Sequence, residues 1–357
     1  MILVERIKKA GRIAIYGAQA TACGVASALI DVFGNVPEAI IVSNLKGNPI
    51  EIRGVKVIEL KEAFELKDCL ILVAVPVNLH EEILSVLCRN GFTNYTTIDS
   101  DAEYELMSLY YKKVRRFPLL RDAAPADAIP NVKILMARSV FDKELSDADL
   151  LNFNKRGIQE IHAGAALSED RIAEITDKDG DNISKHNRQF SELTVTYWAW
   201  KNVEADYKGI CHYRRVLDIP EDDYNKLSSV DVVLPLPFTV YPNASSQFLR
   251  FIHEEEYNAL LLALREIAPE YYVAAHKFWY EPYLYNYNIL IAKEKIFNSY
   301  CEFIFNVLFA VKKSFSDKGI RQNNRYIGYL GEILTSLYFM VNEKQVRVAH
   351  AKKLWLV

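Results

Sequence analysis

Cysteine is scarce in this chain, and no two cysteines stand in a CxxC pair. The five cysteines are Cys23, Cys69, Cys88, Cys211 and Cys301. Their spacing argues against a zinc site or a dithiol redox motif, and a dispersed odd number is typical of reduced thiols in the cytoplasm. Long apolar runs are missing too. No run of about 18 apolar residues predicts a membrane span, and charges interrupt the apolar residues at the N-terminus, so we expect no signal peptide.

An excess of charge of one sign is absent as well. The 357 residues carry a net charge of −3, with 25% charged and 50% hydrophobic residues. The basic excess that is typical of nucleic-acid binding is missing, so we expect no nucleic-acid partner. Length and composition together predict a soluble cytoplasmic protein of about two domains.

Short apolar runs alternate with helical stretches over residues 1–100. Strands are expected at Arg12–Tyr16, Ala39–Val42, Val55–Ile58, Cys69–Val75 and Tyr95–Ile98. Helices are expected at Ala18–Leu29 and His80–Asn90. This alternation predicts a parallel, doubly wound sheet, and we interpret residues 1–100 as a Rossmann-like domain.

Most glycines of a dinucleotide-binding fingerprint are missing from this domain. Gly17 follows the first strand as the first glycine of GxGxxG, but Gln19 stands where a pyrophosphate would approach the backbone. The second strand ends in Ser43 and Asn44, without the acid that holds an adenine ribose. NAD binding is therefore disfavoured, although the helix after Gly17 offers its N-terminus to another phosphate. The domain resembles the small nucleotide-sugar-binding domain that precedes some bacterial sugar acetyltransferases, and a degenerate docking domain is an equal alternative.

Residues 101–130 connect this domain to the rest of the chain. Asp101–Leu120 predicts a helix, and Arg121–Pro130, which is rich in small residues and proline, predicts a linker. The helix carries the basic residues Lys112, Lys113, Arg115 and Arg116. This cluster is either a solvated helix face, which is the more common case, or a contact with an anionic membrane. Residues 131–357 form the second domain.

Polar and aromatic residues concentrate between Asp177 and Arg215. The segment begins with carboxylates and amides and ends with HYRR, directly behind a predicted strand at Tyr207–Cys211. A guanidinium presents a planar fork of donors to phosphate oxygens, whereas carboxylates and amides suit sugar hydroxyls. The segment therefore predicts a sugar-nucleotide site. The candidate donor-binding residues are Asp181, Asn182, Ser184, Asn187, His212, Arg214 and Arg215.

The acids at the start of this segment do not form a calcium loop. That pattern requires Gly at the sixth position from Asp177 and Glu at the twelfth, where this chain has Asn182 and Arg188. We interpret Asp177 and Asp179 as a solvated acidic turn.

Several blocks of the second domain occur in a recognisable order. They are DGDNIS, SELTVTYWAWKN, GICHYRR, DVVLP, YNYNILI and RYIGYLGEIL. From about Val132 onward, the chain resembles a bacterial glycosyltransferase family of capsular and exopolysaccharide gene clusters, long catalogued as a domain of unknown function. Family members usually carry a His-Lys segment after the first strand, where this chain has Arg138 and Ser139.

The resemblance implies a GT-A-like α/β domain that transfers a sugar, in some members galactofuranose. The implied donor is a nucleoside diphosphate sugar such as a UDP-sugar, and the acceptor is a glycan or a lipid-linked glycan at the inner face of the membrane. The GT-A fold often holds Mn²⁺ or Mg²⁺ with an Asp-x-Asp at a strand end, and HYRR stands in the corresponding place. Two arginines would then neutralise the departing diphosphate in place of a cation, while a metal requirement stays open.

A transferase that inverts the anomeric centre needs a base for the acceptor hydroxyl. Asp231, His253 and Glu332 are candidates, and we favour Glu332, with a structural ion pair to Arg325 as the alternative. On the acceptor side we expect Asn288, which matches a family block. Trp200 is the other acceptor-side candidate, because one residue of the Trp198–Trp200 pair should pack in the core and the other face a sugar.

Two other functions stay open. In the first, the chain is an NAD-dependent sugar-nucleotide oxidoreductase or epimerase whose active site lies in residues 1–100. In the second, the chain binds sugar nucleotides without catalysis, so it keeps its affinity for the donor but never transfers the sugar.

Overall fold

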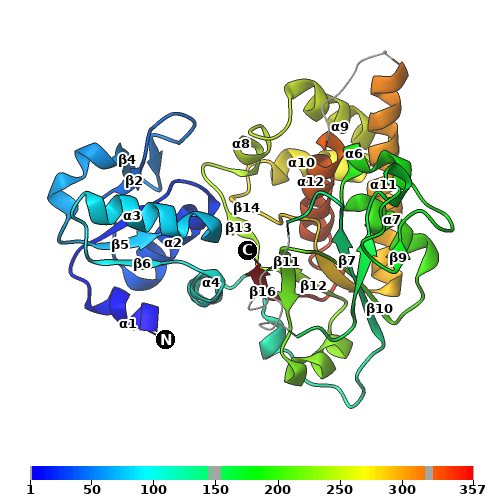
Figure 1. Cartoon of the computed structure of the whole chain (residues 1–357), viewed down its shortest axis with the longest axis horizontal. Coiled ribbons are helices and arrows are strands. Elements are labelled where there is room, and N and C mark those ends of the chain that lie inside the picture. The colour runs from blue at the N-terminus through cyan, green and yellow to red at the C-terminus, as the bar shows by residue number, and fades with distance from the viewer. Residues whose placement is uncertain (1, 144, 146–153, 318–324, 357) are drawn as a thin grey trace. The chain divides into compact units, whose positions relative to one another are not determined.

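The computed structural model describes residues 2–143, 145, 154–317 and 325–356, and the chain divides into two compact units (Figure 1). Unit 1 consists of Met1–Pro118 with the segment Phe238–Asn243, and unit 2 consists of Leu119–Pro237 with Ala244–Leu356. Each unit has its own sheet, and each is described separately below.

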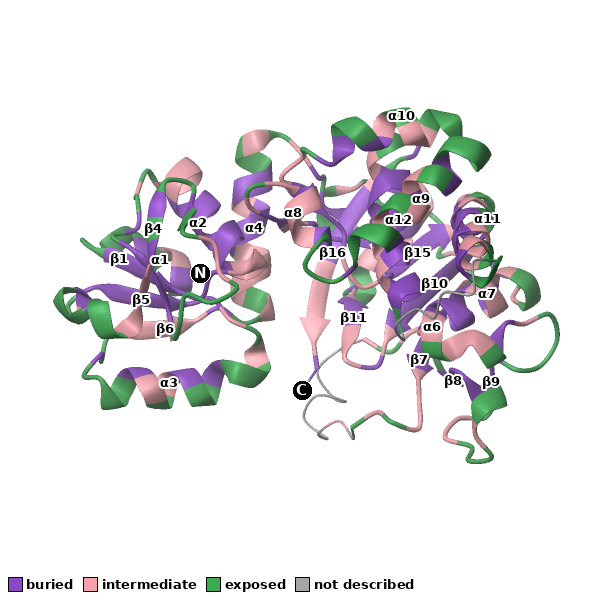
Figure 2. Cartoon of the chain, turned by 90° about the horizontal axis from the view of Figure 1, so that it is seen from above, coloured by how far each residue is buried: buried purple, intermediate pink, exposed green. Residues whose placement is uncertain are grey.

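Unit 1 is built on a six-stranded sheet in the order β3-β4-β2-β1-β5-β6. The strands are β1 (Ile13–Tyr16), β2 (Ile40–Val42), β3 (Glu51–Ile52), β4 (Val55–Glu59), β5 (Leu70–Val73) and β6 (Tyr95–Thr97). All neighbours run parallel except β3, which is antiparallel to β4. Strands β1 and β5 are buried along their whole length (Figure 2), as expected where helices cover both faces of a parallel sheet. The predicted Rossmann-like parallel sheet is confirmed.

The helices of unit 1 pack around this sheet. They are α1 (Ile2–Lys9), α2 (Ala20–Phe33), α3 (His80–Arg89) and α4 (Ser100–Val114), and strand β13 (Phe238–Thr239) packs on α2. Helices α2 and α4 approach closely at Gly24, where an added Cβ would lie 2.8 Å from the sulfur of Met107. Helix α4 ends at Val114, before the expected Leu120, because Arg115 adopts a left-handed conformation with φ 55°. The basic residues Lys112, Lys113 and Arg115 are exposed at this end.

Gly17 is required by packing between neighbouring strands. Its φ is +113°, and an added Cβ would lie 2.5 Å from the carbonyl oxygen of Ala74, which follows β5. The side chain of Gln19, just before α2, donates to Asn48 at 2.8 Å. Backbone conformation and packing therefore explain why residue 17 is a glycine, without a bound ligand.

Unit 2 contains an eight-stranded mixed sheet in the order β11-β16-β12-β15-β10-β7-β8-β9. The strands are β7 (Val132–Arg138), β8 (Ile158–His162), β9 (Ile175–Thr176), β10 (Tyr207–His212), β11 (Arg215–Asp218), β12 (Val232–Pro235), β15 (Leu290–Lys293) and β16 (Val348–Trp355). Strand β10 lies between β7, which is parallel to it, and β15, which is antiparallel. The last strand, β16, pairs with β11 on one side and with β12 on the other.

Helices cover one face of the central strands of unit 2. They include α7 (Leu193–Asn202) and α11 (Glu294–Asp317), both of which contact β10. The remaining elements are α6 (Asn187–Phe190), α8 (Ala244–Phe248), α9 (Glu254–Ile267), α10 (Pro269–Phe278), β14 (Tyr283–Leu284) and α12 (Tyr326–Val341). Helix α12 packs against α11 with large buried side chains; the rings of Tyr300 and Phe339 stack with centroids 5.3 Å apart. Across the described residues, none of the helices combines the length and the apolar character that a membrane crossing requires.

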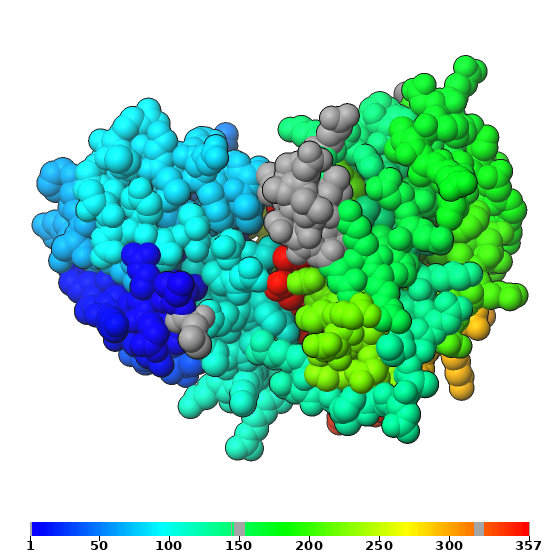
Figure 3. Space-filling view, turned by 60° about the horizontal axis from the view of Figure 1, so that its bottom comes forward, coloured from blue at the N-terminus to red at the C-terminus, as the bar shows by residue number. Residues whose placement is uncertain are grey.

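The first residues of unit 2, from Leu119 to Pro130, pack against a later segment of the same unit. In Figure 3 the yellow-green surface of the 3-10 helix Glu221–Ser229 lies beside the teal surface of these first residues. Lys226 donates to the carbonyl oxygen of Arg121 at 2.6 Å, and Ser228 donates to that of Ala128 at 3.1 Å. Residues that looked like a polar linker are therefore held on the surface by side chains of a distant segment.

Candidate functional site

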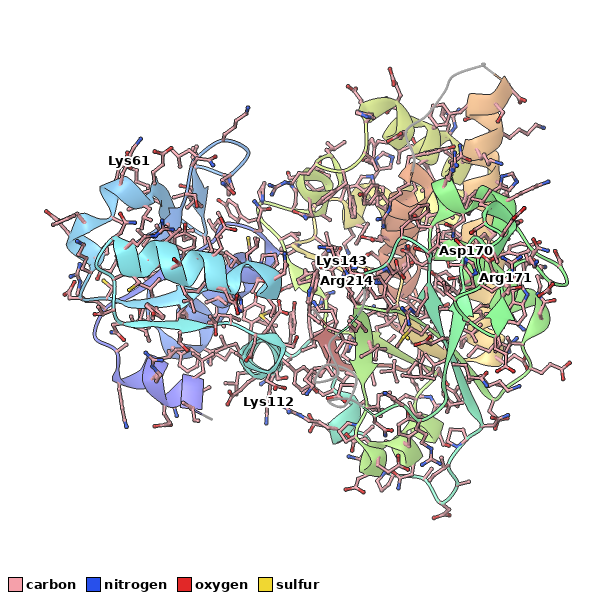
Figure 4. All side chains as sticks on the ribbon, viewed as in Figure 1. Lys61, Lys112, Lys143, Asp170, Arg171 and Arg214 are labelled. Atoms are coloured by element: carbon pink, nitrogen blue, oxygen red, sulfur yellow. The ribbon has the colours of Figure 1, made fainter. Side chains whose placement is uncertain are left out.

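HYRR forms the tight turn that joins β10 to β11, at the carboxyl end of β10. His212 pairs with Arg215 across the turn, so Tyr213 and Arg214 are its two central residues, and Arg214 is labelled in Figure 4. The neighbouring parallel strand β7 ends at Arg138. The carboxyl ends of parallel strands meet at one edge of a sheet, which is where ligands bind in open α/β sheets. This edge of unit 2, called here the arginine edge, therefore collects Arg138, Arg214 and Arg215.

Each of these arginines keeps an unsatisfied donor. Among the described residues, the buried Nε atoms of Arg138, Arg214 and Arg215 have no hydrogen-bond partner. Arg138 uses its Nη1 for Glu160, at 3.2 Å from both carboxylate oxygens. A buried N–H without an acceptor is unfavourable by about 1–3 kcal/mol unless a ligand or water satisfies it. Three such donors at one edge indicate a place for an anion with several oxygens.

Asp142 offsets part of this positive charge. Its carboxylate accepts from the backbone N–H of Ser139 at 2.8 Å and from the Ser139 hydroxyl at 2.9 Å. Burial raises the pKa of Asp142, while these hydrogen bonds and the charges of Arg138 and Arg214 act against that rise. The net charge of the arginine edge is therefore smaller than its arginines alone would give.

Arg215 is held between two aromatic rings. Its guanidinium carbon lies 4.0 Å from the ring centroid of Tyr287 and 4.2 Å from that of Trp355. Trp355 is the residue of β16 that pairs with Arg215 across the two strands. Burial lowers the pKa of Arg215. The rings fix the plane of the guanidinium before any ligand arrives, so little ordering remains for the binding step.

His212 is a neutral imidazole. Burial and the charges of Arg215, Arg214 and Arg325 lower its pKa to about 3. The backbone N–H of Arg214 donates to Nδ1 at 3.4 Å, which assigns the imidazole proton to Nε2. His212 can therefore donate a hydrogen bond at this edge, but it is a poor candidate for a base.

Two carboxylates face the same region of unit 2. Glu332 lies on α12, and Glu192 immediately precedes α7 and is buried. Burial and the neighbouring Glu192 raise the pKa of Glu332 to about 8, opposed by Arg215, by a backbone hydrogen bond from Tyr287 and by Arg325. A carboxyl group that titrates near neutral pH suits a general base. Arg325, the partner of the alternative ion pair, is the weakest of these influences on the pKa of Glu332.

Sequence reasoning missed Glu192 as a site residue, because its position before a helix also suits a purely local role at the helix N-terminus. The partner that identifies it lies far along the chain. Asn288 donates to Glu192 at 2.9 Å, and its Nδ2 also lies 3.2 Å from the carbonyl oxygen of Gly328. The side-chain oxygen of Asn288 accepts from Thr335 at 3.2 Å. Asn288 is only 1% exposed, so it positions Glu192 and has no free surface for the acceptor contact that the sequence predicted.

The turn Tyr287–Asn288 has an uncommon backbone conformation. Both residues have positive φ, 79° and 47°, although neither is glycine. This turn supplies the backbone N–H that reaches Glu332, the amide that holds Glu192 and the ring that stacks on Arg215. Such strain persists where the surrounding contacts require it, and it is frequent at functional sites.

Asp177, the first residue of the polar segment that ends at Arg215, is part of the core. Asp177 is fully buried, in contrast to the solvated turn that we expected. Its carboxylate accepts from the backbone N–H groups of Gly164 and Ala165, at 2.8 and 3.0 Å, and from the hydroxyls of Ser184 and Thr194. Four donors compensate for the buried charge, so the carboxylate fixes the loop that precedes α7. Asp179 is exposed, as expected.

Two of the predicted donor-binding residues, Asn182 and Asn187, form hydrogen bonds with groups close to them in the sequence. Asn182 donates to the carbonyl oxygens of Lys178 and Gly180, and Asn187 donates to the carbonyl oxygen of Ser191 and to Thr194. Ser184 has no exposed surface, so we assign its hydroxyl to the support of Asp177.

Asp181 lies away from the arginine edge. It is exposed and accepts from Tyr197 at 3.1 Å, and its backbone bonds to Asn202 at the end of α7. Glu192 precedes the opposite end of this helix, and a rise of about 1.5 Å per residue separates the two ends by roughly 15 Å. The structure therefore does not bring Asp181 and the neighbouring Asn182 together with the arginines.

The other predicted residues also lie elsewhere in unit 2. Trp200 stacks on Phe305 at 5.9 Å between centroids, with the amine of Lys201 3.3 Å from its ring centroid, in the half of α7 that lies away from Glu192. His253 precedes α9, where its backbone N–H donates to Glu256 at 2.9 Å. Trp200 therefore has a packing role, and His253 has a capping role at the start of α9.

Asp231 stands at the opposite edge of the sheet. It precedes β12, which runs parallel to β10 because both are antiparallel to β15. Its carboxylate binds Arg347 at 2.7 Å and Lys293 at 2.9 Å. The hydrogen bonds from Arg347 hold the pKa of Asp231 far below its usual range. A carboxylate held in this way at the far edge of the sheet forms structural ion pairs, which argues against Asp231 as the catalytic base.

Comparison with known proteins gives the chain a family. Residues 148–344, more than half of the chain, match the family described as "Domain of unknown function (DUF4422)", and the chain belongs to that family. No curated protein matches the chain. It is similar to a solved structure, the apo form of the bifunctional glycosyltransferase WbbM, with a TM-score of 0.54 and 25% sequence identity.

The likeness to WbbM covers 63% of this chain and 45% of that one, so the chain spans less than half of the WbbM chain. The neighbour and the observed sheets together confirm the predicted α/β fold class, with a mainly parallel sheet in unit 1 and a mixed sheet in unit 2.

Proposed function

We propose that the chain is a glycosyltransferase that moves a sugar from a nucleoside diphosphate sugar, most simply a UDP-sugar, to a hydroxyl group of a glycan or lipid-linked acceptor. Galactose and galactofuranose are the sugars that we would test first, and synthesis of a surface polysaccharide is the process. The observation that carries the proposal is the unsatisfied arginine edge beside a carboxyl group that titrates near neutral pH. The likeness to a bifunctional glycosyltransferase supports it.

In this proposal the arginines bind the diphosphate. Arg214 and Arg215 direct their buried N–H donors to its oxygens, and Arg138 adds a third guanidinium from the neighbouring strand. Negative charge builds on the diphosphate as the sugar leaves, and donors already fixed in place stabilise it most. Arg215 meets this condition because two rings hold it.

The residues of this edge do not suit Mn²⁺ or Mg²⁺. Those cations need several oxygen ligands, mainly carboxylates, carbonyls and phosphates. The arginine edge presents guanidinium groups, which repel a cation, and the described part of the chain contains no group of three or more His, Cys, Asp or Glu side chains placed to hold a metal. We therefore derive no step through a metal and assign the charge neutralisation to arginine.

Glu332 is the proposed general base. It takes the proton from the acceptor hydroxyl as that oxygen forms its bond to the anomeric carbon. The bond from the anomeric carbon to the diphosphate oxygen breaks, and the nucleoside diphosphate leaves with the electron pair. This direct displacement inverts the anomeric centre, and Glu192 raises the basicity of Glu332 from beside it.

A thermal-shift screen tests donor binding. UDP, UDP-galactose, UDP-galactofuranose, GDP- and CDP-sugars and NAD are each added with Mn²⁺ or with EDTA. At a ligand concentration of about 100 Kd, binding stabilises the folded chain by about 2.7 kcal/mol. We expect a shift with uridine nucleotides that survives EDTA. Arg214→Ala should weaken UDP binding roughly 10- to 100-fold, as expected for the loss of a charged hydrogen bond.

Arg265→Ala is the matched control, because Arg265 is an exposed arginine on α9. It should bind UDP as the wild type does. A shift with NAD alone would move the function to unit 1 and support an oxidoreductase or epimerase. UDP-sugar binding without release of UDP, over a panel of acceptors, would support a protein that binds sugar nucleotides without catalysis.

A further inference from the structure

One face of α12 joins the proposed base to aromatic surface. Tyr329 and Glu332 are three residues apart, which places them on the same side of the helix, and Arg325 immediately precedes the first helical residue, Tyr326. Tyr329 precedes Glu332 by a rise of about 4.5 Å along the axis. Whatever touches Glu332 therefore has Tyr329 as a close neighbour.

A second aromatic residue extends this face outward. The ring of Phe251 stacks on Tyr329, with centroids 5.6 Å apart and planes 27° apart. Phe251 belongs to the connection between α8 and α9 and is 55% exposed, whereas the adjacent Ile252 is buried at 4% and anchors the connection. The guanidinium carbon of Arg325 lies 5.7 Å from the ring centroid of Tyr329. An aromatic pair thus reaches solvent on the side of α12 that carries the base.

We propose that Phe251 and Tyr329 form an acceptor subsite, on which a sugar ring of the acceptor glycan stacks. A sugar ring has an apolar face of C–H groups that packs on an aromatic ring, and hydroxyls at its rim that bond to groups such as guanidinium. Arg325 stands beside the stack to supply such donors. The proposal rests on the proposed function, because it takes Glu332 to be the base that touches the acceptor hydroxyl.

The nucleotide of the donor is the competing occupant of an aromatic platform, since a nucleobase also stacks. Position favours the acceptor. The base must contact the acceptor, and the platform is one helical turn from it on the same helix, whereas the diphosphate is assigned to the arginines of strands β7, β10 and β11. The test therefore measures the acceptor and the donor separately.

The experiment uses the full chain, UDP-galactose or UDP-galactofuranose as donor, and octyl glycosides of galactopyranose, galactofuranose, glucose and mannose as acceptor probes. Saturation-transfer NMR in the presence of UDP measures acceptor binding, and UDP release measures transfer. Phe251→Ala and Tyr329→Ala should each raise the acceptor KM or Kd about tenfold, the loss expected for an aromatic contact. Tyr329→Phe keeps the stack and should resemble the wild type. Binding of UDP alone should not change in any of them.

Tyr280→Ala is the control, because Tyr280 is a 78% exposed aromatic residue elsewhere on unit 2. If the wild type fails to bind UDP and to release it from the donor, the proposed function itself is wrong. If UDP binds and turns over, the subsite is overturned by an unchanged acceptor KM in both alanine variants, by an equal loss of UDP affinity, or by the absence of binding for every glycoside of the panel.

Discussion

Replacement of Glu332 by glutamine tests the chemistry most directly. Glutamine keeps the size of the side chain but cannot accept a proton, so the transfer rate should fall by about 10²–10⁴-fold, the usual contribution of a general base. Donor affinity should stay close to that of the wild type, because the arginines bind the diphosphate. Glu302→Gln, which changes an exposed acid on α11, is the control and should transfer at the wild-type rate.

The pH dependence gives a sharper version of this prediction. With a pKa of about 8 for Glu332, only about one tenth of the base is ionised at pH 7. The rate should therefore rise about tenfold from pH 7 to pH 9 and then level off. Because Glu192 adds to the raised pKa of Glu332, Glu192→Gln should shift this rise to lower pH.

Both effects are measured by UDP release under single-turnover conditions between pH 5.5 and 9.5, with UDP affinity measured at each pH. A wild-type rate that does not depend on pH, together with an active Glu332→Gln variant, would refute the assignment of the base. A rise that moves to higher pH in Glu192→Gln would refute the electrostatic coupling of the two carboxylates.

Three further predictions concern stability and surface charge. Asp177→Asn should destabilise the fold by about 2–4 kcal/mol in urea unfolding, because an amide cannot accept from four donors at once; a loss below about 0.5 kcal/mol would contradict this role. Asp231→Asn should lower the free energy of unfolding by about 1–3 kcal/mol and leave the pH profile of transfer intact. Because the pKa of Asp231 is held low in the folded state, its contribution to wild-type stability should be present at neutral pH and disappear as the pH falls through the acid range. The variant should lack this acid-sensitive part of the stability. If the basic end of α4 contacts membranes, the chain should sediment with vesicles that contain about 30% anionic lipid. The double substitution Lys112→Glu with Lys113→Glu should abolish this sedimentation. Sedimentation that does not respond to salt or to the double substitution would contradict the membrane contact.

Local patterns predicted the framework because they reflect local physics. The short apolar runs of residues 1–100 became the parallel strands of unit 1, and HYRR was expected at the end of a strand, where the structure places it. Periodicity and strand ends are properties of a few consecutive residues. They do not require knowledge of which distant segment packs against them.

The environment of single polar groups could not be predicted in the same way. Asp177 looked solvated because it stands among other acids, yet it is buried by donors that lie up to 17 residues away. Glu192 depends on Asn288, 96 residues further along the chain. Burial of a charge is decided by such long-range partners, so composition and spacing alone misplace it.

The choice among the three candidate bases depended on strand direction. Asp231 and HYRR both flank strands of the same sheet, and the sequence does not give the relative direction of those strands. The antiparallel strand β15 lies between β12 and β10, so these two run in the same direction. The start of β12 therefore lies at the edge opposite the end of β10. The rule that directs ligands to the carboxyl ends of strands, which favoured Arg214 and Arg215, thus also argues against Asp231. Glu332 differs from Asp231 in that Arg215, a residue of the arginine edge, influences its pKa.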